Sequence, residues 1–210
     1  MEEMNVSAFQ TPEEGFWAGA FGDEYMARNQ GNDAIATNVA LFSNILRQCR
    51  AVDSILEFGA NIGMNLQALR VLLPNAKLSA IEINEKAVQQ LRALRDVEVF
   101  HQSILSFCPD HTWEVVLTKG VLIHINPDKL SHVYRLLYES SHRYICLAEY
   151  YNPSPVTVAY RGHEEKLFKR DFAGEMLDRY KDLSLVDYGF VYHRDRQFPQ
   201  DDLTWFLLEK

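Results

Sequence analysis

The sequence predicts an α/β fold, in which a mostly parallel sheet of seven strands carries helices on both faces and ends in an antiparallel last strand. Two observations predict this fold. Along most of the 210-residue chain, short apolar runs of β type alternate with stretches of helical spacing, which is the pattern of parallel strands joined by crossover helices. Close to the carboxyl end the alternation stops, and two apolar runs joined by a polar connection predict an antiparallel pair.

The elements follow in order along the chain. Apolar runs of β type predict strands at about 54–58, 78–83, 97–100, 113–117, 144–148, 183–192 and 203–208. Apolar residues at helical spacing, several of them after a capping residue, predict helices at about 33–49, 65–73, 85–94, 128–138 and 172–180. Residues 160–170 mix charged and aromatic side chains without a clean period, which is typical of a solvated face or of a wall beside a pocket.

Composition limits the kind of protein that this chain can be. Hydrophobic residues make up 47% of the sequence and charged residues 24%, which is ordinary for one globular domain spanning residues 1–210. The net charge of −8 repels phosphate backbones, so we do not expect a nucleic acid as partner. No apolar run approaches the ~18 residues of a membrane span, and three separated cysteines are typical of a reducing compartment. We therefore expect a cytoplasmic protein outside the membrane.

The turn after the first predicted strand is the strongest sign of a binding site. Glu57 stands at the end of that strand, and Gly59 and Gly63 follow it four residues apart. Glycine removes the Cβ atom that would keep a ligand away from the backbone, and ligands of open α/β sheets bind at the carboxyl ends of strands. Glu82 ends the next strand, where a carboxylate can accept hydrogen bonds from both hydroxyl groups of a ribose. The dinucleotide fingerprint G-x-G-x-x-G fits less well, because no third glycine follows within the helix.

This arrangement resembles the S-adenosylmethionine (SAM) site of class I methyltransferases, although the common family form has another glycine where Asn61 stands. The resemblance implies a Rossmann-like fold with SAM as cofactor. Segments 21–29, 56–63 and 118–125 together are similar to the pseudaminic acid biosynthesis-associated methylases over nearly the whole chain, and in that family asparagine at this position is ordinary. No metal is expected, because the histidines lack the spacing of metal ligands.

The resemblance also indicates which residues would bind the cofactor. These are Tyr25, Arg28, Asn29, Glu57, Gly59, Ala60, Asn61, Gly63, Glu82, Ile83, Ser103, Ile104 and Lys119. Residues 1–50 would form an N-terminal helical cap over the cofactor, with Arg28 paired to the methionine carboxylate, although the aromatic residues of this cap fit a core equally well. Ser103 stands where many methyltransferases have an acidic residue near the adenine, and it would contact the adenine or serve only as a turn residue.

Candidates for the chemistry lie after the fourth and fifth strands. His124 is a candidate base, because an imidazole titrates near neutral pH, and a hydrogen-bonded structural histidine fits equally well. Tyr150 is a second candidate catalytic residue. Tyr151, Arg161 and His163 are candidates for binding the substrate, the last two within a possible acceptor-site segment at 153–180, and Arg161 could grip a carboxylate through two hydrogen bonds.

The sequence thus predicts an enzyme that transfers a methyl group from SAM to a small metabolite, which is sugar-related or carboxylate-bearing. Two alternatives remain at this point, a SAM-binding regulatory module without catalytic activity and a protein or RNA methyltransferase. The acidic net charge and the lack of a basic, aromatic-lined groove disfavour the second of these. A homodimer is possible.

Overall fold

The structure is a computed structural model and describes residues 9–28 and 31–210, without the side chains of residues 27, 28, 32, 33 and 163–165. The α-helices are α1 (Pro12–Ala18), α2 (Ala20–Arg28), α3 (Asn32–Leu46), α4 (Met64–Leu72), α5 (Glu85–Ala93), α6 (Pro127–Ser140) and α7 (Phe172–Arg179). The strands are β1 (Ser54–Phe58), β2 (Lys77–Glu82), β3 (Val97–His101), β4 (Trp113–Lys119), β5 (Ser141–Glu149), β6 (Val156–Tyr160), β7 (His163–Lys169), β8 (Ser184–Val191) and β9 (Leu203–Glu209). Two 3-10 helices, η1 (Ile104–Ser106) and η2 (Leu122–His124), follow β3 and β4.

Seven strands form one sheet in the order β3-β2-β1-β4-β5-β9-β8. The first five strands run parallel to one another, whereas β9 is antiparallel to both of its neighbours, β5 and β8. This confirms the predicted fold class, including the antiparallel last strand.

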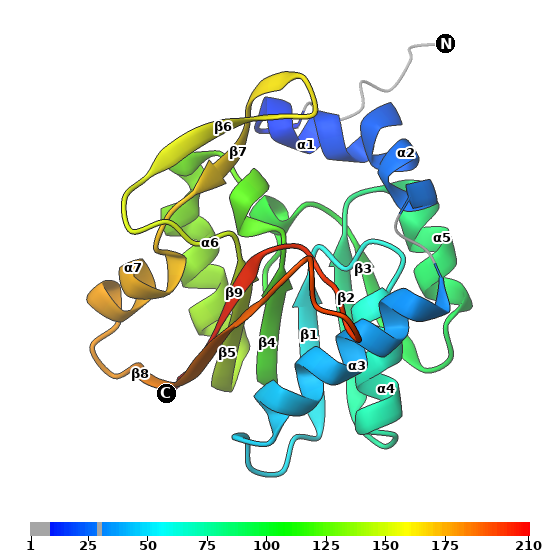
Figure 1. Ribbon diagram of the computed structural model, residues 1–210, viewed down its shortest axis with the longest axis vertical. Helices are drawn as coiled ribbons and strands as arrows, with labels where there is room; N and C mark the ends of the chain where they lie inside the picture. Colours follow the sequence, from blue (N-terminus) through cyan, green and yellow to red (C-terminus); the bar gives the residue numbers. More distant parts are fainter. Residues whose placement is uncertain (1–8, 29–30) are drawn as a thin grey trace.

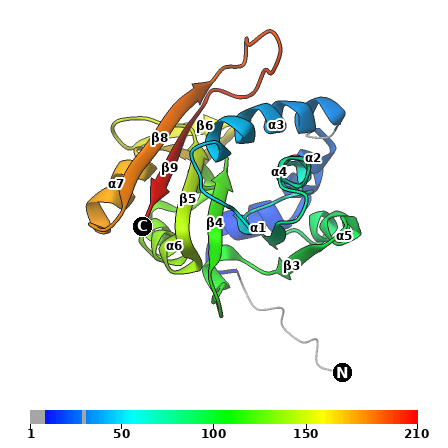
Figure 2. The same ribbon diagram turned by 90° about the horizontal axis from the view of Figure 1, so that it is seen from below.

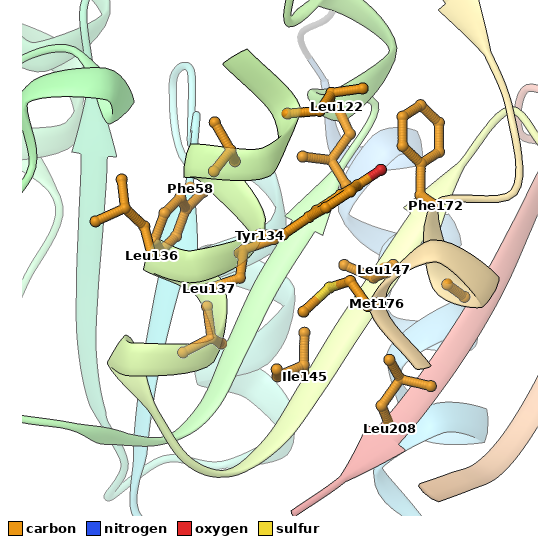
Figure 3. Close-up of a cluster of buried hydrophobic side chains, with 14 of the residues drawn as sticks. Phe58, Leu122, Tyr134, Leu136, Leu137, Ile145, Leu147, Phe172, Met176 and Leu208 are labelled. Carbon is orange, nitrogen blue, oxygen red and sulfur yellow. The ribbon is translucent and has the colours of Figure 1, made fainter. Parts of the chain in front are cut away.

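Helices cover both faces of the sheet (Figures 1 and 2). On one face α3 and α4 pack on the sheet through a core that contains Phe42 and Leu69. On the other face α6 and α7 contribute Tyr134 and Met176 to a second core, shown in Figure 3. The central strands are buried on both faces, which explains their nearly continuous apolar sequences.

The sequence did not predict the hairpin of β6 and β7. Among the described residues these two strands form a separate two-stranded sheet, in a part of the chain that the sequence left without regular structure. Alternation fails here because β6 is mostly exposed, while consecutive residues Leu167 and Phe168 of β7 are buried. Arg161 and Gly162 at the tip both have positive φ, of 49° and 84°, as tight hairpin turns require.

The connectivity places a crevice at the carboxyl ends of β1 and β4. From β1 the chain continues outward to β2 and β3, and it then returns to β4 on the other side of β1. The loops after these two strands therefore diverge, which is the usual position of a ligand site in such sheets. Helices α1 and α2 and the β6-β7 hairpin lie over this edge of the sheet (Figure 1). In the part of the chain that the structure describes, no helix has the length and apolar character of a membrane span.

Candidate functional site

The turn between β1 and α4 has a backbone that few residue types can adopt. Gly59, Asn61 and Gly63 have φ angles of 70°, 49° and 80°. A Cβ atom on Gly59 would come within 2.8 Å of Val121 Cγ2, and one on Gly63 within 2.6 Å of Leu94 Cδ1. Asparagine is among the few other residues that enter the left-handed region readily, which explains why Asn61 can stand where related turns have glycine.

Glu82 ends β2 directly beside this turn. Its Oε2 accepts a hydrogen bond from the backbone N–H of Asn61 at 2.7 Å, and its Oε1 accepts from the N–H groups of Ile83 at 2.9 Å and Asn84 at 2.8 Å. Burial raises the pKa of this carboxyl, and the three N–H donors act in the opposite direction. The carboxylate is therefore fixed in orientation by the backbone and retains acceptor capacity toward a ligand.

Glu57 lies one layer deeper and has a different environment. Its side chain is 1% exposed, Oε1 accepts from Asn65 Nδ2 at 2.5 Å, and Oε2 has no hydrogen-bond partner among the described residues. Burial raises the pKa of Glu57 to about 8. Burial also lowers the pKa of Lys119, which ends β4, and the charge of Glu57 opposes that shift. Each of these two buried groups therefore favours the charged form of the other.

Helix α1 is held over the carboxyl edge by two carboxylates. Thr11 and Glu14 form a capping box in which Glu14 N–H donates to Thr11 Oγ1 and Thr11 N–H donates to Glu14 Oε2. Glu14 Oε1 also accepts from the Ser103 hydroxyl after β3, and Glu13 Oε1 pairs with Lys166 Nζ of β7 at 3.2 Å. These contacts bring the amino-terminal segment to the ends of strands far away in the sequence.

Asn84 links α1 and α2 to the Glu82 turn. Its Oδ1 caps α5 through the N–H of Ala87, and its Nδ2 donates to Asp23 Oδ1 of α2 at 3.0 Å and to the carbonyl of Trp17 at 3.3 Å. The cap of α5 was expected from the sequence. The contact with α1 and α2 was not, because it joins residues more than 60 positions apart.

His124 ends η2 and points one ring nitrogen at the β6-β7 hairpin. Its Nδ1 lies 2.6 Å from the carbonyl oxygen of Lys166, so Nδ1 carries the proton and donates it, and Nε2 keeps its lone pair. The side chain is 7% exposed, and burial lowers its pKa to about 4. The imidazole is therefore neutral near pH 7. Its ring packs against Trp17 and Tyr160, with centroid distances of 4.6 and 4.9 Å.

Glu149 at the end of β5 determines the path of the segment that carries His124. Its carboxylate accepts hydrogen bonds from the backbone N–H groups of Val121 and Leu122, both at 3.1 Å, and from that of Ile123 at 3.4 Å. The residue is 3% exposed, and burial raises its pKa to about 7. Sequence inspection did not indicate this role, because nothing in the pattern shows that a strand-ending glutamate faces a neighbouring loop.

These segments enclose a cavity of about 680 Å³ at the carboxyl edge of the sheet. Its size lies within the usual range for small-molecule sites. The described residues that line it come from α1, α2, α3, the turns after β1 to β4, and the connection between β8 and β9. That connection is anchored to α3, where Gln200 Nε2 donates to the carbonyl of Thr37 at 2.8 Å.

Most of the predicted cofactor residues lie together in this cavity. Those that line it are Tyr25, Gly59, Ala60, Asn61, Glu82, Ile83, Ser103, Ile104 and Lys119. Glu57 and Gly63 lie behind this wall instead, Glu57 against Asn65 and Gly63 against Leu91 and Leu94. Asn29 lies outside the described residues, as does the side chain of Arg28.

The predicted catalytic and substrate residues are more dispersed. His124 lines the cavity. Tyr150 packs at its border, where burial followed by the charge of Asp201 raises the pKa of the phenol. Tyr151 is 42% exposed, and Arg161 is exposed at the hairpin tip, so both lie outside the cavity lining. The side chain of His163 is not described.

Several lining residues were missed by sequence inspection. Glu13, Glu14 and Trp17 come from α1, and Gln200 and Asp201 come from the connection between β8 and β9. The capping box with a following proline at Pro12 is a readable helix start that could have indicated α1. The polar connection before β9 carries no comparable signal.

Comparison with solved structures agrees with this architecture. The plantazolicin methyltransferase BpumL in complex with SAH has a TM-score of 0.66 at 14% sequence identity, and the match covers 94% of each chain. The magnesium protoporphyrin IX methyltransferase ChlM from Synechocystis PCC 6803 with bound SAM gives 0.62 at 13% identity, over 98% of this chain and 100% of that one. The glycopeptide N-methyltransferase MtfA complexed with SAM gives 0.61 at 10% identity, over 82% and 93%.

The chain has the fold of the class I SAM-dependent methyltransferases. No protein-family model and no curated protein sequence matches it. The likeness is therefore one of structure, at a level of identity that conveys the fold alone.

Proposed function

We propose that this protein is a SAM-dependent methyltransferase that acts on a small metabolite. The observation that carries the proposal is the position of the Glu82 carboxylate, which lines the cavity next to the left-handed turn at Gly59 and Asn61. A nucleoside with a free ribose suits this pair, because the carboxylate accepts hydrogen bonds from hydroxyl groups and the glycine admits the ligand to the backbone.

The chain's own groups fit SAM in two further respects. Asn61 lines the cavity, and its Oδ1 is buried without a hydrogen-bond partner among the described residues, so an acceptor is available there for a ligand donor. The Ser103 to Leu105 segment lines the same cavity as the Glu82 carboxylate, so both could contact one nucleoside. When bound, SAM supplies an electrophilic methyl group.

The roles of the protein groups follow from their environments. Glu82 would hold the ribose, Ile83, Ser103 and Ile104 would contact the adenine, and the turn at 59–61 would face the rest of the cofactor. Helix α1 would exclude water from above, since Glu13, Glu14 and Trp17 line that side. The Nε2 atom of neutral His124 would accept a hydrogen bond from the molecule that receives the methyl group.

The finer expectation of a sugar-related acceptor rests on the resemblance to the pseudaminic acid biosynthesis-associated methylases. A carboxylate-bearing acceptor rests on the same resemblance. Arg161, the candidate for gripping that carboxylate, lies at the hairpin tip outside the cavity lining. The cytoplasmic location and the homodimer remain predictions.

Calorimetric titration with S-adenosylhomocysteine tests the proposal. We expect saturable binding by the wild-type chain and binding weaker by roughly tenfold or more in Glu82→Gln, since a charge-assisted hydrogen bond to the ribose is lost. Glu85→Gln, which changes an exposed carboxylate three residues further on in α5, is the matched control and should bind as the wild type does. Absence of binding at millimolar ligand would contradict the proposal.

The two alternatives differ in the fate of the methyl group. A regulatory module would bind S-adenosylhomocysteine but transfer no labelled methyl group from SAM to any compound in a cell extract. A protein or RNA methyltransferase would label the macromolecular fraction of that extract. We expect the label in the fraction of small molecules.

A further inference from the structure

We propose that the methyl acceptor is a cationic amine, bound in the part of the cavity bordered by Trp17, Tyr25, His124 and Asp201. This inference rests on the proposed methyltransferase function and deepens it by naming the substrate class. It differs from the expectation of a carboxylate-bearing acceptor, and three features of the cavity support it.

The first feature is charge. The described lining residues include four carboxylates, Glu13, Glu14, Glu82 and Asp201, and a single lysine, Lys119. The first three carboxylates already have partners in the protein. Glu13 pairs with Lys166, Glu14 accepts from Thr11 N–H and from the Ser103 hydroxyl, and Glu82 accepts from backbone N–H groups. Lys119 is itself surrounded by the charges of Glu57, Asp201 and Glu149. The electrostatic field of this wall therefore favours a cation over an anion.

The second feature is that Asp201 has no ion-pair partner among the described residues. The Tyr150 phenol is hydrogen-bonded to this carboxylate, and the charge of the carboxylate acts on Lys119 and Arg161. No ion pair within 4.0 Å joins Asp201 to a described residue. Asp201 lines the cavity on the connection between β8 and β9, which Gln200 anchors to α3. The phenol occupies one acceptor position of the carboxylate, and the other positions are available to an ammonium group of a ligand.

The third feature is the aromatic wall with a buried acceptor in it. Trp17 and Tyr25 meet edge to face at 5.3 Å, and both line the cavity, where aromatic rings attract cations. His124 is 93% buried, since 7% of its surface is exposed, and Nε2 has no hydrogen-bond partner among the described residues. Because Nδ1 donates to Lys166, this Nε2 can only accept, and an amine N–H is a suitable donor.

These features separate an amine from other acceptors. A carboxylate offers no hydrogen to Nε2 and would meet a wall of like charge. A hydroxyl group could donate to Nε2 but would gain little from the charge of Asp201 or from the rings. In the transfer, an ammonium first loses one proton to solvent. The amine nitrogen then forms a bond to the methyl carbon as the carbon–sulfur bond breaks, and the electron pair of that bond stays on sulfur.

The experiment measures binding to protein saturated with S-adenosylhomocysteine, so that it does not depend on turnover. Benzylamine, benzoate and benzyl alcohol share one ring and differ in charge, and each is titrated close to neutral pH. We expect benzylamine to bind at least about tenfold more tightly than the other two compounds. In Asp201→Asn this preference should fall by about fivefold, while the affinity for S-adenosylhomocysteine is unchanged. Asp178→Asn, a change at a 92% exposed carboxylate of α7, is the matched control and should keep the preference.

Each outcome has a definite meaning. If benzoate or benzyl alcohol binds as tightly as benzylamine, or if benzylamine does not bind, the amine inference is wrong and the proposed cofactor site still stands. An unchanged preference in Asp201→Asn would also overturn it. Failure of S-adenosylhomocysteine to bind would instead contradict the proposed function. As a second readout, labelled methyl transfer from SAM should appear on amines of a metabolite panel, and labelling confined to hydroxyl or carboxyl compounds would overturn the inference.

Discussion

Asn61 has the most constrained backbone of the described non-glycine residues at the site. It combines a φ of 49° with an N–H that donates to Glu82 and an Oδ1 that is buried without a partner among the described residues. The positive φ is a property that only a few residue types tolerate. The unpaired Oδ1 costs stability in the free protein, and a ligand donor would remove that cost.

Substitution of Asn61 should distinguish its conformational role from its polar one. Asn61→Gly should change the free energy of unfolding by about 0.5 kcal/mol or less, because glycine adopts positive φ and removes the unpaired oxygen. Asn61→Val should lower it by about 2 kcal/mol, since a β-branched residue is strained there. Urea denaturation measures both, and equal stability of the two variants would contradict this explanation.

At the scale of elements, α1 decides whether the cavity is enclosed. This short helix has a sequence start that is easy to recognise, but its place over the sheet edge depends on contacts of Glu13 with β7 and of Glu14 with the end of β3. An isolated helix of seven residues is not stable in water, so tertiary contacts must supply its stability. The β6-β7 hairpin depends on the same region, because the Lys166 ammonium group pairs with Glu13 and the Lys166 carbonyl accepts a hydrogen bond from His124.

Removing the charge of Glu13 should therefore loosen α1. In Glu13→Gln, we expect amide hydrogen exchange in residues 12–18 to become about tenfold faster, because Lys166 loses its partner in a mostly buried setting. Exchange in the central strands should not change. Glu24→Gln, at an exposed position of α2, is the matched control. Unchanged exchange in α1 would show that apolar packing alone holds the helix.

At the scale of the whole molecule, buried ionisable groups at the carboxyl edge of the sheet lower the stability of the fold. Lys119 and Glu149 end strands β4 and β5, and Glu57 is the next-to-last residue of β1. Burial shifts the pKa of all three groups toward the neutral form. Buried ionisable groups are expensive, and their concentration at one edge is typical of functional sites.

Glu57 gives a test through the pH dependence of folding. Its folded-state pKa of about 8 lies above the ordinary value of 4.5, so its contribution to stability is fully present below pH 4.5 and is lost as the pH rises through 8. Glu57→Gln keeps an oxygen for Asn65 and carries no charge. In urea denaturation, we expect the free energy of unfolding of this variant to increase relative to that of the wild type as the pH rises from about 4.5 to 8, by about 3 kcal/mol near pH 7.

The control for this change is Glu85→Gln, at an exposed carboxylate, which should follow the wild-type pH profile. A Glu57→Gln variant that is less stable than the wild type across the whole pH range would mean that the carboxylate is stabilised by the folded state. It would also mean that burial does not dominate its ionisation.

Much of the fold could be predicted because its information is local. The apolar run at 113–117 and the helical spacing at 128–138 both reflect burial along one element, and both elements are present. The hairpin at 156–169 escaped prediction because its burial depends on what it covers. Leu167 and Phe168 are adjacent and both buried, which no alternating pattern would indicate.

The sequence by itself determined the order of the seven strands of the main sheet and of the helices between them, the glycine turn at 59–63, and Glu82 at the end of the next strand. These features depend on residues close together in the chain, where side-chain periodicity and backbone preference act directly. Only the tertiary structure decided that α1 and the β8-β9 connection enclose the cavity, that His124 is neutral with Nε2 free of described partners, and that Arg161 lies outside. Burial and charge at a site are sums over segments far apart in the sequence, and folding alone brings those segments together.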